Sequence, residues 1–276
     1  MAQQISVVEK NVRTEQRERI YLGNNRALTR LLWGQKIIVD TEDLSLSPHI
    51  LLDGYWERWI SEVFLKAIKP GMHVIDIGSN LGYYSLLAGR LLGAKGRLTC
   101  FEANPVMADI TLRNLDINGF GGISEVISKA VYKEESTLPF TILKRHKGSS
   151  GLFVGSSEIQ NVFHESSEKI LVPTVSLDQF FPSGTRIDVI KVDAEGAEPY
   201  IFEGAQRLLK ENNVQVFMEF DPGIIKDYSI EKFLQMLKTL QFNAYEILED
   251  SSLQYLDENS LKNGARRDLL LKKQNG

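Results

Sequence analysis

The sequence is short of several residue patterns, and each shortage excludes a class of protein. It has one cysteine, Cys100, in 276 residues. No internal disulfide and no cysteine-based zinc cage can therefore form. Blocks of five or more basic residues are also missing, and the formal net charge is -4. Because nucleic-acid binding relies on clustered Lys and Arg, we expect no nucleic-acid partner.

Long apolar runs are missing as well. No apolar stretch approaches the roughly 20 residues that span a bilayer. The first residues are polar and charged, without the apolar core of a signal peptide. We therefore expect a cytoplasmic protein with no membrane contact. Charged residues make up 25% and hydrophobic residues 43% of the chain, as in soluble globular domains. Homo-oligomerisation remains open.

The most informative segment is an apolar run that ends in a glycine turn. Residues 73–77 have the character of a buried strand, Gly78 and Gly82 frame a turn, and apolar residues then recur at helical spacing. Doubly wound sheets bind nucleotides at such a strand–turn–helix corner. The turn lacks the G-x-G-x-x-G pattern of dinucleotide sites, and Asp76 just before it would repel a pyrophosphate.

A second acid lies where a nucleoside would place its sugar. Glu102 ends the next apolar run, 20 residues beyond Gly82, and an acid at that position commonly binds ribose hydroxyls. A ligand with a ribose and a positive centre but no phosphate is S-adenosylmethionine. The alternative is a generic Rossmann turn with an unknown ligand.

Strands and helices alternate from Met72 onward, which predicts a mostly parallel sheet covered on both faces. We expect residues 1–70 to form an N-terminal accessory or cap segment and residues 71–276 to form the α/β domain. Strands are expected near 73–77, 97–102, 123–128, 187–192, 214–219, 242–248 and 266–272, and helices near 55–69, 82–93, 105–117, 197–210 and 230–240.

One stretch, residues 132–176, breaks this alternation. It is polar and rich in Gly and Ser, with two possible strands at 138–143 and 170–175 and no helical pattern. An insertion at this point lies above the ligand crevice, where long loops are often substrate walls. We expect it to shape the acceptor site; a decorative surface hairpin is the alternative.

A third acidic motif follows the strand expected at 187–192. Asp193, Glu195 and Glu198 lie between this strand and the next helix. Glu198 is explained by the helix dipole, which favours acids at a helix start. Asp193 and Glu195 are expected to point into the crevice, and we assign them a catalytic role.

Four segments, in this order, resemble the FkbM family of S-adenosylmethionine-dependent methyltransferases over about residues 55–272. They are Val74-Ile75-Asp76-Ile77-Gly78-Ser79-Asn80-Leu81-Gly82-Tyr83, Phe101-Glu102-Ala103-Asn104-Pro105, Val175-Ser176-Leu177-Asp178 and Lys191-Val192-Asp193-Ala194-Glu195-Gly196-Ala197-Glu198. The first segment alone indicates only the methyltransferase superfamily. Ser79 departs from the family, which commonly has Ala there, and the first 50 residues match no motif of the family.

The resemblance implies a fold, a reaction and a set of binding residues. The fold is the class I methyltransferase fold, a Rossmann-like α/β fold with a seven-stranded, mostly parallel sheet, helices on both faces and an antiparallel last strand. The reaction is O-methylation of a small-molecule hydroxyl acceptor, typically a sugar or natural product. Asp76 should meet the amino group of the cofactor, Gly78 and Gly82 should pass beneath its methionine part, and Glu102 should hold its ribose. The expected cofactor-binding residues are Asp76, Gly78, Ser79, Asn80, Gly82, Glu102, Ala103, Asn104, Ser128, Ala130 and Asp193.

The acceptor hydroxyl must also lose a proton, which needs a carboxylate, a histidine or a metal-bound alkoxide. His73 begins a strand and is expected to be structural, whereas His146 and His164 either face the substrate or lie in solvent. Asp193 and Glu219 end neighbouring strands and could hold magnesium through oxygen ligands, although we favour a water-linked or substrate-binding role for Glu219.

Three other functions are alternatives. A nucleotide-binding oxidoreductase of the Rossmann type is disfavoured by the missing glycine pattern and by Asp76. A nucleic-acid base methyltransferase would carry an Asn/Asp-Pro-Pro-Tyr/Phe motif where Asp193 stands. A non-catalytic module that only binds S-adenosylmethionine remains an alternative, which product formation would exclude.

Overall fold

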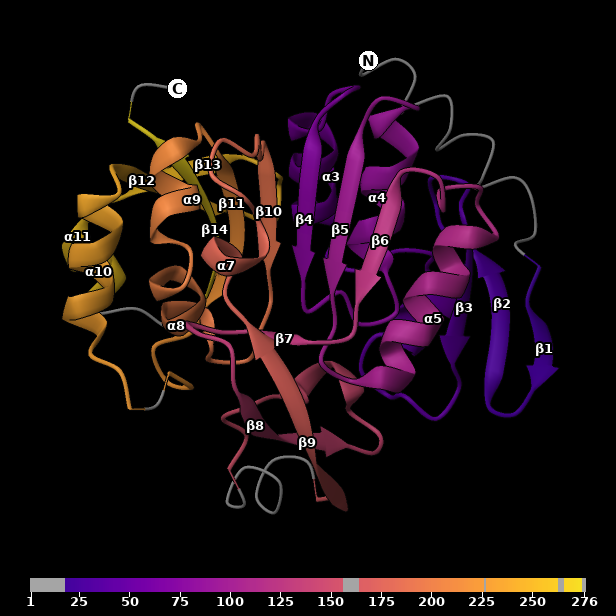
Figure 1. The fold of residues 1–276 in the computed structure, drawn as a ribbon. Coiled ribbons are helices and arrows are strands. Elements are labelled where there is room, and N and C mark those ends of the chain that lie inside the picture. Colours follow the sequence, from indigo (N-terminus) through magenta and orange to yellow (C-terminus); the bar gives the residue numbers. More distant parts are fainter. Residues whose placement is uncertain (1–17, 156–163, 226, 263–265, 275–276) are drawn as a thin grey trace.

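The computed structural model describes residues 18–155, 164–225, 227–262 and 266–274. Its centre is an eight-stranded sheet with the strand order β13-β12-β14-β11-β10-β4-β5-β6 (Figure 1). The strands are β4 (His73–Ile77), β5 (Arg97–Phe101), β6 (Ser124–Ile127), β10 (Val189–Val192), β11 (Gln215–Phe220), β12 (Phe242–Ile247), β13 (Leu253–Leu256) and β14 (Arg267–Lys273).

All seven expected strands are present, and β14 is antiparallel to both of its neighbours, β11 and β12. The predicted α/β architecture is therefore confirmed. The sequence did not indicate the eighth strand, β13, which pairs with β12 at the edge of the sheet. Three of its four residues are exposed, so it lacks the apolar alternation that marks a half-buried strand.

Helices cover both faces of the sheet because successive residues of a buried strand point to opposite sides. On β4, Val74 packs in one hydrophobic cluster and Ile75 in the other. The first cluster includes residues of α3 (Arg58–Ala67), α4 (Tyr83–Leu92) and α5 (Pro105–Asp116). The second includes residues of α7 (Leu177–Phe180), α8 (Glu198–Glu203), α9 (Gln206–Glu211), α10 (Ile230–Thr239) and α11 (Glu258–Lys262).

The single helix expected over 197–210 is divided into α8 and α9. The division falls at Gly204, where a Cβ atom would lie 2.4 Å from the carbonyl oxygen of Tyr132. The chain of the insertion crosses the helix at this point. Only a residue without a side chain allows so close an approach.

The N-terminal segment forms its own small sheet beside the central one (Figure 1). Its elements before α3 are β1 (Ile20–Gly23), β2 (Arg26–Arg30), β3 (Lys36–Asp40) and α2 (Ser47–Leu52). The buried Asn114 of α5 ties β3 in place, accepting from the Ile38 N–H at 2.7 Å and donating to its carbonyl at 3.0 Å. Residues 1–17 lie outside the described residues.

The insertion folds as the three-stranded sheet β7-β9-β8, made of β7 (Ala130–Val131), β8 (Thr137–Leu143) and β9 (Ser167–Val175). Both expected strands are present in it. Figure 1 places this sheet beyond the carboxyl ends of β4, β5 and β6, at the bottom of the view.

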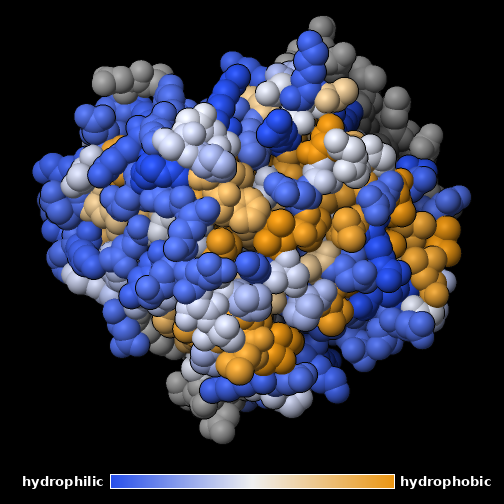
Figure 2. All heavy atoms as spheres, in the orientation of Figure 1, coloured by the Kyte–Doolittle hydropathy of each residue, from blue (hydrophilic) through white to orange (hydrophobic). Residues whose placement is uncertain are grey.

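The surface in Figure 2 is hydrophilic over the C-terminal helices and carries apolar atoms near the middle and over the N-terminal sheet. Ile20, Tyr21 and Leu22 of the edge strand β1 are among the exposed large hydrophobic residues. None of the helices in the described ranges combines the length and apolar character that crossing a membrane requires.

Candidate functional site

A cavity of about 270 Å³ opens at the carboxyl ends of the central strands. The sheet, the N-terminal segment and the insertion all contribute to its lining. Nine of the predicted site residues line it: Asp76, Gly78, Ser79, Asn80, Glu102, Ala103, Ala130, Asp193 and Glu195. The sequence therefore identified residues that the fold brings together from β4, β5 and β10 and, with Ala130, from β7.

The other three predicted residues lie outside the cavity lining. Gly82 precedes α4 with a φ of 84°, and Asn104 caps α5 by accepting from the Val106 N–H at 3.0 Å. Both positions have a structural reason that does not involve a ligand. Ser128 is exposed in the loop after β6.

Position 78 must be a glycine because the turn after β4 packs closely against the end of β10. Gly78 has a φ of 76°, and a Cβ atom there would lie 1.8 Å from the backbone oxygen of Asp193. The turn after β4 therefore packs directly on the residue that ends β10. This contact places Asp193 beside the glycine turn.

Glu102 is buried and held by two backbone amides. Its Oε2 accepts from the Asn80 N–H at 2.7 Å and its Oε1 accepts from the Asn104 N–H at 2.8 Å. Burial raises its pKa to about 7, against the lowering effect of these two hydrogen bonds. The carboxylate is thus fixed in orientation, with lone pairs left for hydroxyl donors.

Asp76 lies at the other side of the turn, fully buried. Its Oδ2 accepts from the Ser85 hydroxyl at 2.5 Å, and burial raises its pKa to about 6. Nearby, the Ser79 Oγ is buried without a hydrogen-bond partner among the described residues. An unpaired buried hydroxyl on the cavity wall fits a polar ligand group that completes it.

Asp193 is held by a buried lysine two residues earlier. The Lys191 Nζ lies 3.2 Å from the Asp193 Oδ2 and 5.0 Å from the centre of the Tyr84 ring. Burial lowers the pKa of Lys191, but the charges of Asp193, Glu57 and Asp76 outweigh it and the net shift is upward. Lys191 therefore remains a cation and cannot act as a base.

Glu195 also lies at the cavity, in a left-handed conformation with a φ of 50°. Burial and the charges of Asp193, Glu219 and Glu198 raise its pKa well above the usual range, against the lowering effect of Arg266. Glu198 does not line the cavity, because its carboxylate accepts from the Ala194 N–H at 3.0 Å at the start of α8. Its predicted structural role is therefore supported.

Three histidines were considered from the sequence, and the structure shows the role of His73. It is buried, and its Nε2 lies 3.0 Å from the Thr99 hydroxyl, so its structural role is confirmed. His146 contacts Glu165 at 2.7 Å, and His164 is exposed. Neither lines the cavity.

The residues present do not fit the magnesium site considered from the sequence. Glu219 is paired with Arg266, whose Nη2 lies 2.7 Å from its Oε2. Within the described ranges, no group of three or more His, Cys, Asp or Glu side chains is arranged to hold a metal ion.

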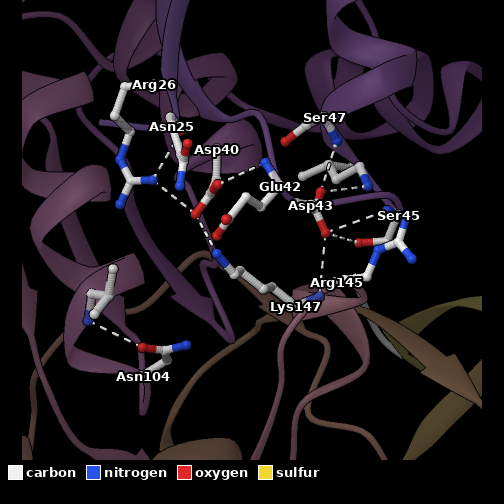
Figure 3. Close-up of polar contacts among 12 residues, drawn as sticks. Asn25, Arg26, Asp40, Glu42, Asp43, Ser45, Ser47, Asn104, Arg145 and Lys147 are labelled. Atoms are coloured by element: carbon white, nitrogen blue, oxygen red, sulfur yellow. Dashed lines mark hydrogen bonds and ion pairs between the residues drawn. The ribbon is translucent and has the colours of Figure 1, made fainter. Parts of the chain in front are cut away.

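The insertion and the N-terminal segment meet through polar contacts (Figure 3), and Ser45 and Lys147 of this region line the cavity. Asp40 forms ion pairs with Lys147 and with Arg26, and the Asp43 carboxylate accepts from the Lys147 N–H at 3.2 Å. Farther in, Phe140 and Leu152 of the insertion pack near Ala103, which follows Glu102. The insertion thus borders the Glu102 end of the cavity, and it also lies beside Glu195, since a Cβ on Gly151 would lie 3.0 Å from the Glu195 Cβ.

A sequence model of the FkbM methyltransferase domain matches residues 76–247. The match covers more than half of the chain and runs from Asp76 through Glu102 to Asp193. The chain belongs to the FkbM methyltransferase family. It is a methyltransferase that depends on S-adenosylmethionine, and its sheet is that of the class I fold.

The known proteins that this chain resembles are distant relatives. Methyltransferase sdnD from Sordaria araneosa is 24% identical over 219 residues, which are 71% of this chain and 82% of that protein. Methyltransferase 1 from Beauveria bassiana is 22% identical over 144 residues, 48% of this chain and 57% of that protein. The crystal structure of methyltransferase FkbM from Methylobacillus flagellatus is 12% identical, with a TM-score of 0.46, over 76% of this chain and 50% of that chain.

Several cavity residues of this FkbM methyltransferase were not predicted from the sequence. Glu57 and Arg266 lie outside the matched range, and Lys191 lies inside it. The sequence could have indicated Lys191, since a lysine inside a buried apolar strand must pair with an opposite charge. Glu57 carried no such signal, because an acid at the start of a helix is already explained by the helix dipole.

We expect the ligand-free methyltransferase to lose stability as pH rises from about 5.5 to about 8. Folding raises the pKa of Glu57 and of Glu102 from 4.5 to about 7. The folded state therefore binds more protons than the unfolded state in this window, and the free energy of unfolding decreases with pH. His73, with a pKa lowered by burial, opposes this only below 6.5. Thermal unfolding across a pH series measures the slope, which Glu102→Gln should make shallower. A midpoint that rises over the window would contradict the prediction.

Proposed function

We propose that this protein transfers the methyl group of S-adenosylmethionine to a hydroxyl of a small molecule, a sugar or another natural product. The observation that carries the proposal is the position of Asp193. Its backbone packs on Gly78 of the glycine turn, and its carboxylate lines the same cavity as Glu102. A proton acceptor therefore lies beside the part of the cavity assigned to the donor.

The donor is assigned to the β4 and β5 side of the cavity. Glu102 would hold the ribose hydroxyls, and Asp76 would meet the amino group. Ser79 supports the assignment because its unpaired hydroxyl can donate a hydrogen bond to the methionine part of S-adenosylmethionine. When bound, S-adenosylmethionine supplies an electrophilic methyl group on a sulfonium sulfur.

Asp193 would orient the acceptor hydroxyl and take its proton. Lys191 holds one carboxylate oxygen, Oδ2. No hydrogen bond within the described residues engages the other, Oδ1, which can accept from a hydroxyl. Glu195 lies next along the cavity wall and offers a second carboxylate. Alignment of the hydroxyl with the methyl group supplies much of the rate enhancement in such displacements.

Product chemistry tests the proposal. The purified protein is incubated with S-adenosylmethionine carrying an isotope-labelled methyl group and with a small-molecule extract from cells that lack the protein. We expect one labelled compound, and its nuclear magnetic resonance spectrum should show the methyl on oxygen. A label on nitrogen or carbon would contradict O-methylation, and binding without any labelled product would favour a non-catalytic module.

Glu102→Ala should weaken S-adenosylmethionine binding by about 1.5–3 kcal/mol, because a charged hydrogen-bond partner of the ribose is lost. Isothermal titration calorimetry measures the change. Glu62→Ala is the matched control, since Glu62 pairs with Arg58 on α3 and does not line the cavity. Unchanged affinity in a folded Glu102→Ala protein would show that the ribose lies elsewhere.

A further inference from the structure

The end of the cavity away from Glu102 is lined by four carboxyl groups from three parts of the fold. Glu57 precedes α3, Asp193 and Glu195 follow β10, and Glu219 lies on β11. We call these four residues the acidic wall. Two cations, Lys191 and Arg266, line the cavity among them. If these four carboxyl groups and the two cations are all ionised, negative charges outnumber positive charges at this end of the cavity.

The cations are already engaged within the wall. Lys191 pairs with Asp193 at 3.2 Å. Arg266 lies 2.7 Å from Glu219 and 3.7 Å from Glu57. Glu57 also accepts from the Tyr84 hydroxyl at 3.0 Å.

Glu195 is the member of the wall without a partner. Among the hydrogen bonds and ion pairs of the described residues, none engages its carboxylate. Its backbone is held in the left-handed region at a φ of 50°, which is unfavourable for a residue with a side chain. The insertion covers it from one side, since a Cβ on Gly151 would lie 3.0 Å from the Glu195 Cβ. An unpaired carboxylate fixed at a cavity wall is suited to a cation.

We propose that the acidic wall makes this enzyme select the positively charged methyl donor over its neutral product. The inference rests on the proposed function, which points the methyl-bearing sulfur toward Asp193. S-adenosylmethionine carries a sulfonium charge there, whereas S-adenosylhomocysteine carries a neutral thioether. The negative charge of the acidic wall attracts the sulfonium of S-adenosylmethionine but not the neutral thioether of S-adenosylhomocysteine.

The charge balance of methyl transfer fits this selectivity. The carbon–sulfur bond breaks with its electron pair left on sulfur, and a carbon–oxygen bond forms to the acceptor. The hydroxyl proton passes to a carboxylate of the wall. The wall thus gains one positive charge as the sulfur loses one, and the attraction that held the donor is gone when the product must leave.

Calorimetry with three probes tests the proposal at about pH 8. The probes are S-adenosylmethionine, S-adenosylhomocysteine and sinefungin, which carries a protonated amine in place of the sulfonium methyl. We expect both cationic probes to bind at least about tenfold more tightly than the neutral one, because a charge contact in a partly buried site has this scale. Equal or tighter binding of S-adenosylhomocysteine would overturn the proposal.

Glu195→Gln removes an unpaired carboxyl group, whose ionised form a nearby sulfonium would favour, and keeps the size of the side chain. It should reduce the preference for S-adenosylmethionine over S-adenosylhomocysteine to about threefold or less, while the affinity for S-adenosylhomocysteine stays unchanged. Glu219→Gln should act in the same direction, and Glu62→Gln, outside the cavity, should change neither affinity. A Glu195→Gln protein that loses affinity for both ligands equally would contradict charge selection.

Proton release provides a measurement on the unaltered protein. Burial raises the pKa of Glu57 to about 7 and that of Glu219 to about 8. A sulfonium beside them lowers these pKa values, so S-adenosylmethionine binding near pH 7 should release protons, seen as binding heats that depend on the buffer. S-adenosylhomocysteine should release fewer. Equal proton release with S-adenosylmethionine and S-adenosylhomocysteine would contradict charge selection by the acidic wall. Absence of binding by all three probes would refute the proposed function itself.

Discussion

Asp193→Asn should slow methyl transfer by about 10²–10⁴-fold and leave donor affinity nearly unchanged, because a general base contributes on this scale. The amide keeps the size of the side chain and can still accept from Lys191, so the fold should survive. Single-turnover transfer to the acceptor measures the rate, and calorimetry measures donor binding. We expect the loss in kcat rather than in the binding of the donor.

Asp221→Asn is the matched control for this substitution. Asp221 follows β11 in the same layer of loops, accepts from the Gly223 N–H at 2.8 Å and does not line the cavity. Its turnover should stay within a few fold of the unaltered protein. If Asp193→Asn lowers the unfolding temperature while folded protein keeps its turnover, Asp193 is a structural acid. If a chelator abolishes transfer and magnesium restores it, the base is metal-bound.

Gly78→Ala should destabilise the protein by about 3 kcal/mol or more. The left-handed conformation costs an alanine about 1–2 kcal/mol, and overpacking typically adds about 1–3 kcal/mol. The clash is severe because the Cβ would lie 1.8 Å from a backbone oxygen, which cannot rotate away as a side chain can. A fall of the unfolding midpoint by roughly 6–12 °C is expected. Donor binding should be lost as the two strand ends separate.

Gly71→Ala separates the effect of conformation from the effect of the clash. Gly71 has a φ of 80°, and no atom lies within 4 Å of the position a Cβ would take. Its substitution should therefore cost about 1–2 kcal/mol from the left-handed backbone alone. Equal losses in the two variants would show that the contact between Gly78 and Asp193 is not close.

The half of the site that we propose for the donor was predictable from the sequence because its residues follow local strand and turn patterns. Asp76 and Gly78 follow one strand and Glu102 follows the next. In a parallel sheet, residues at the carboxyl ends of neighbouring strands meet at one edge. The same rule placed Asp193 and Glu195 correctly at the cavity. Seven strands were predicted for the same reason, since each buried strand is a short apolar run between turn residues.

The other half of the site depends on tertiary contacts that no local pattern encodes. Arg266 pairs with both Glu57 and Glu219, although these residues are far apart in the sequence. The reason that Gly78 must be glycine is likewise the backbone of Asp193, more than a hundred residues away. The sequence by itself determined seven strands of the sheet and the cavity residues proposed to bind the donor, since these follow from strand periodicity and turn chemistry. Only the tertiary structure decided the acidic wall, because long-range packing alone sets which distant carboxylates share one low-dielectric cavity.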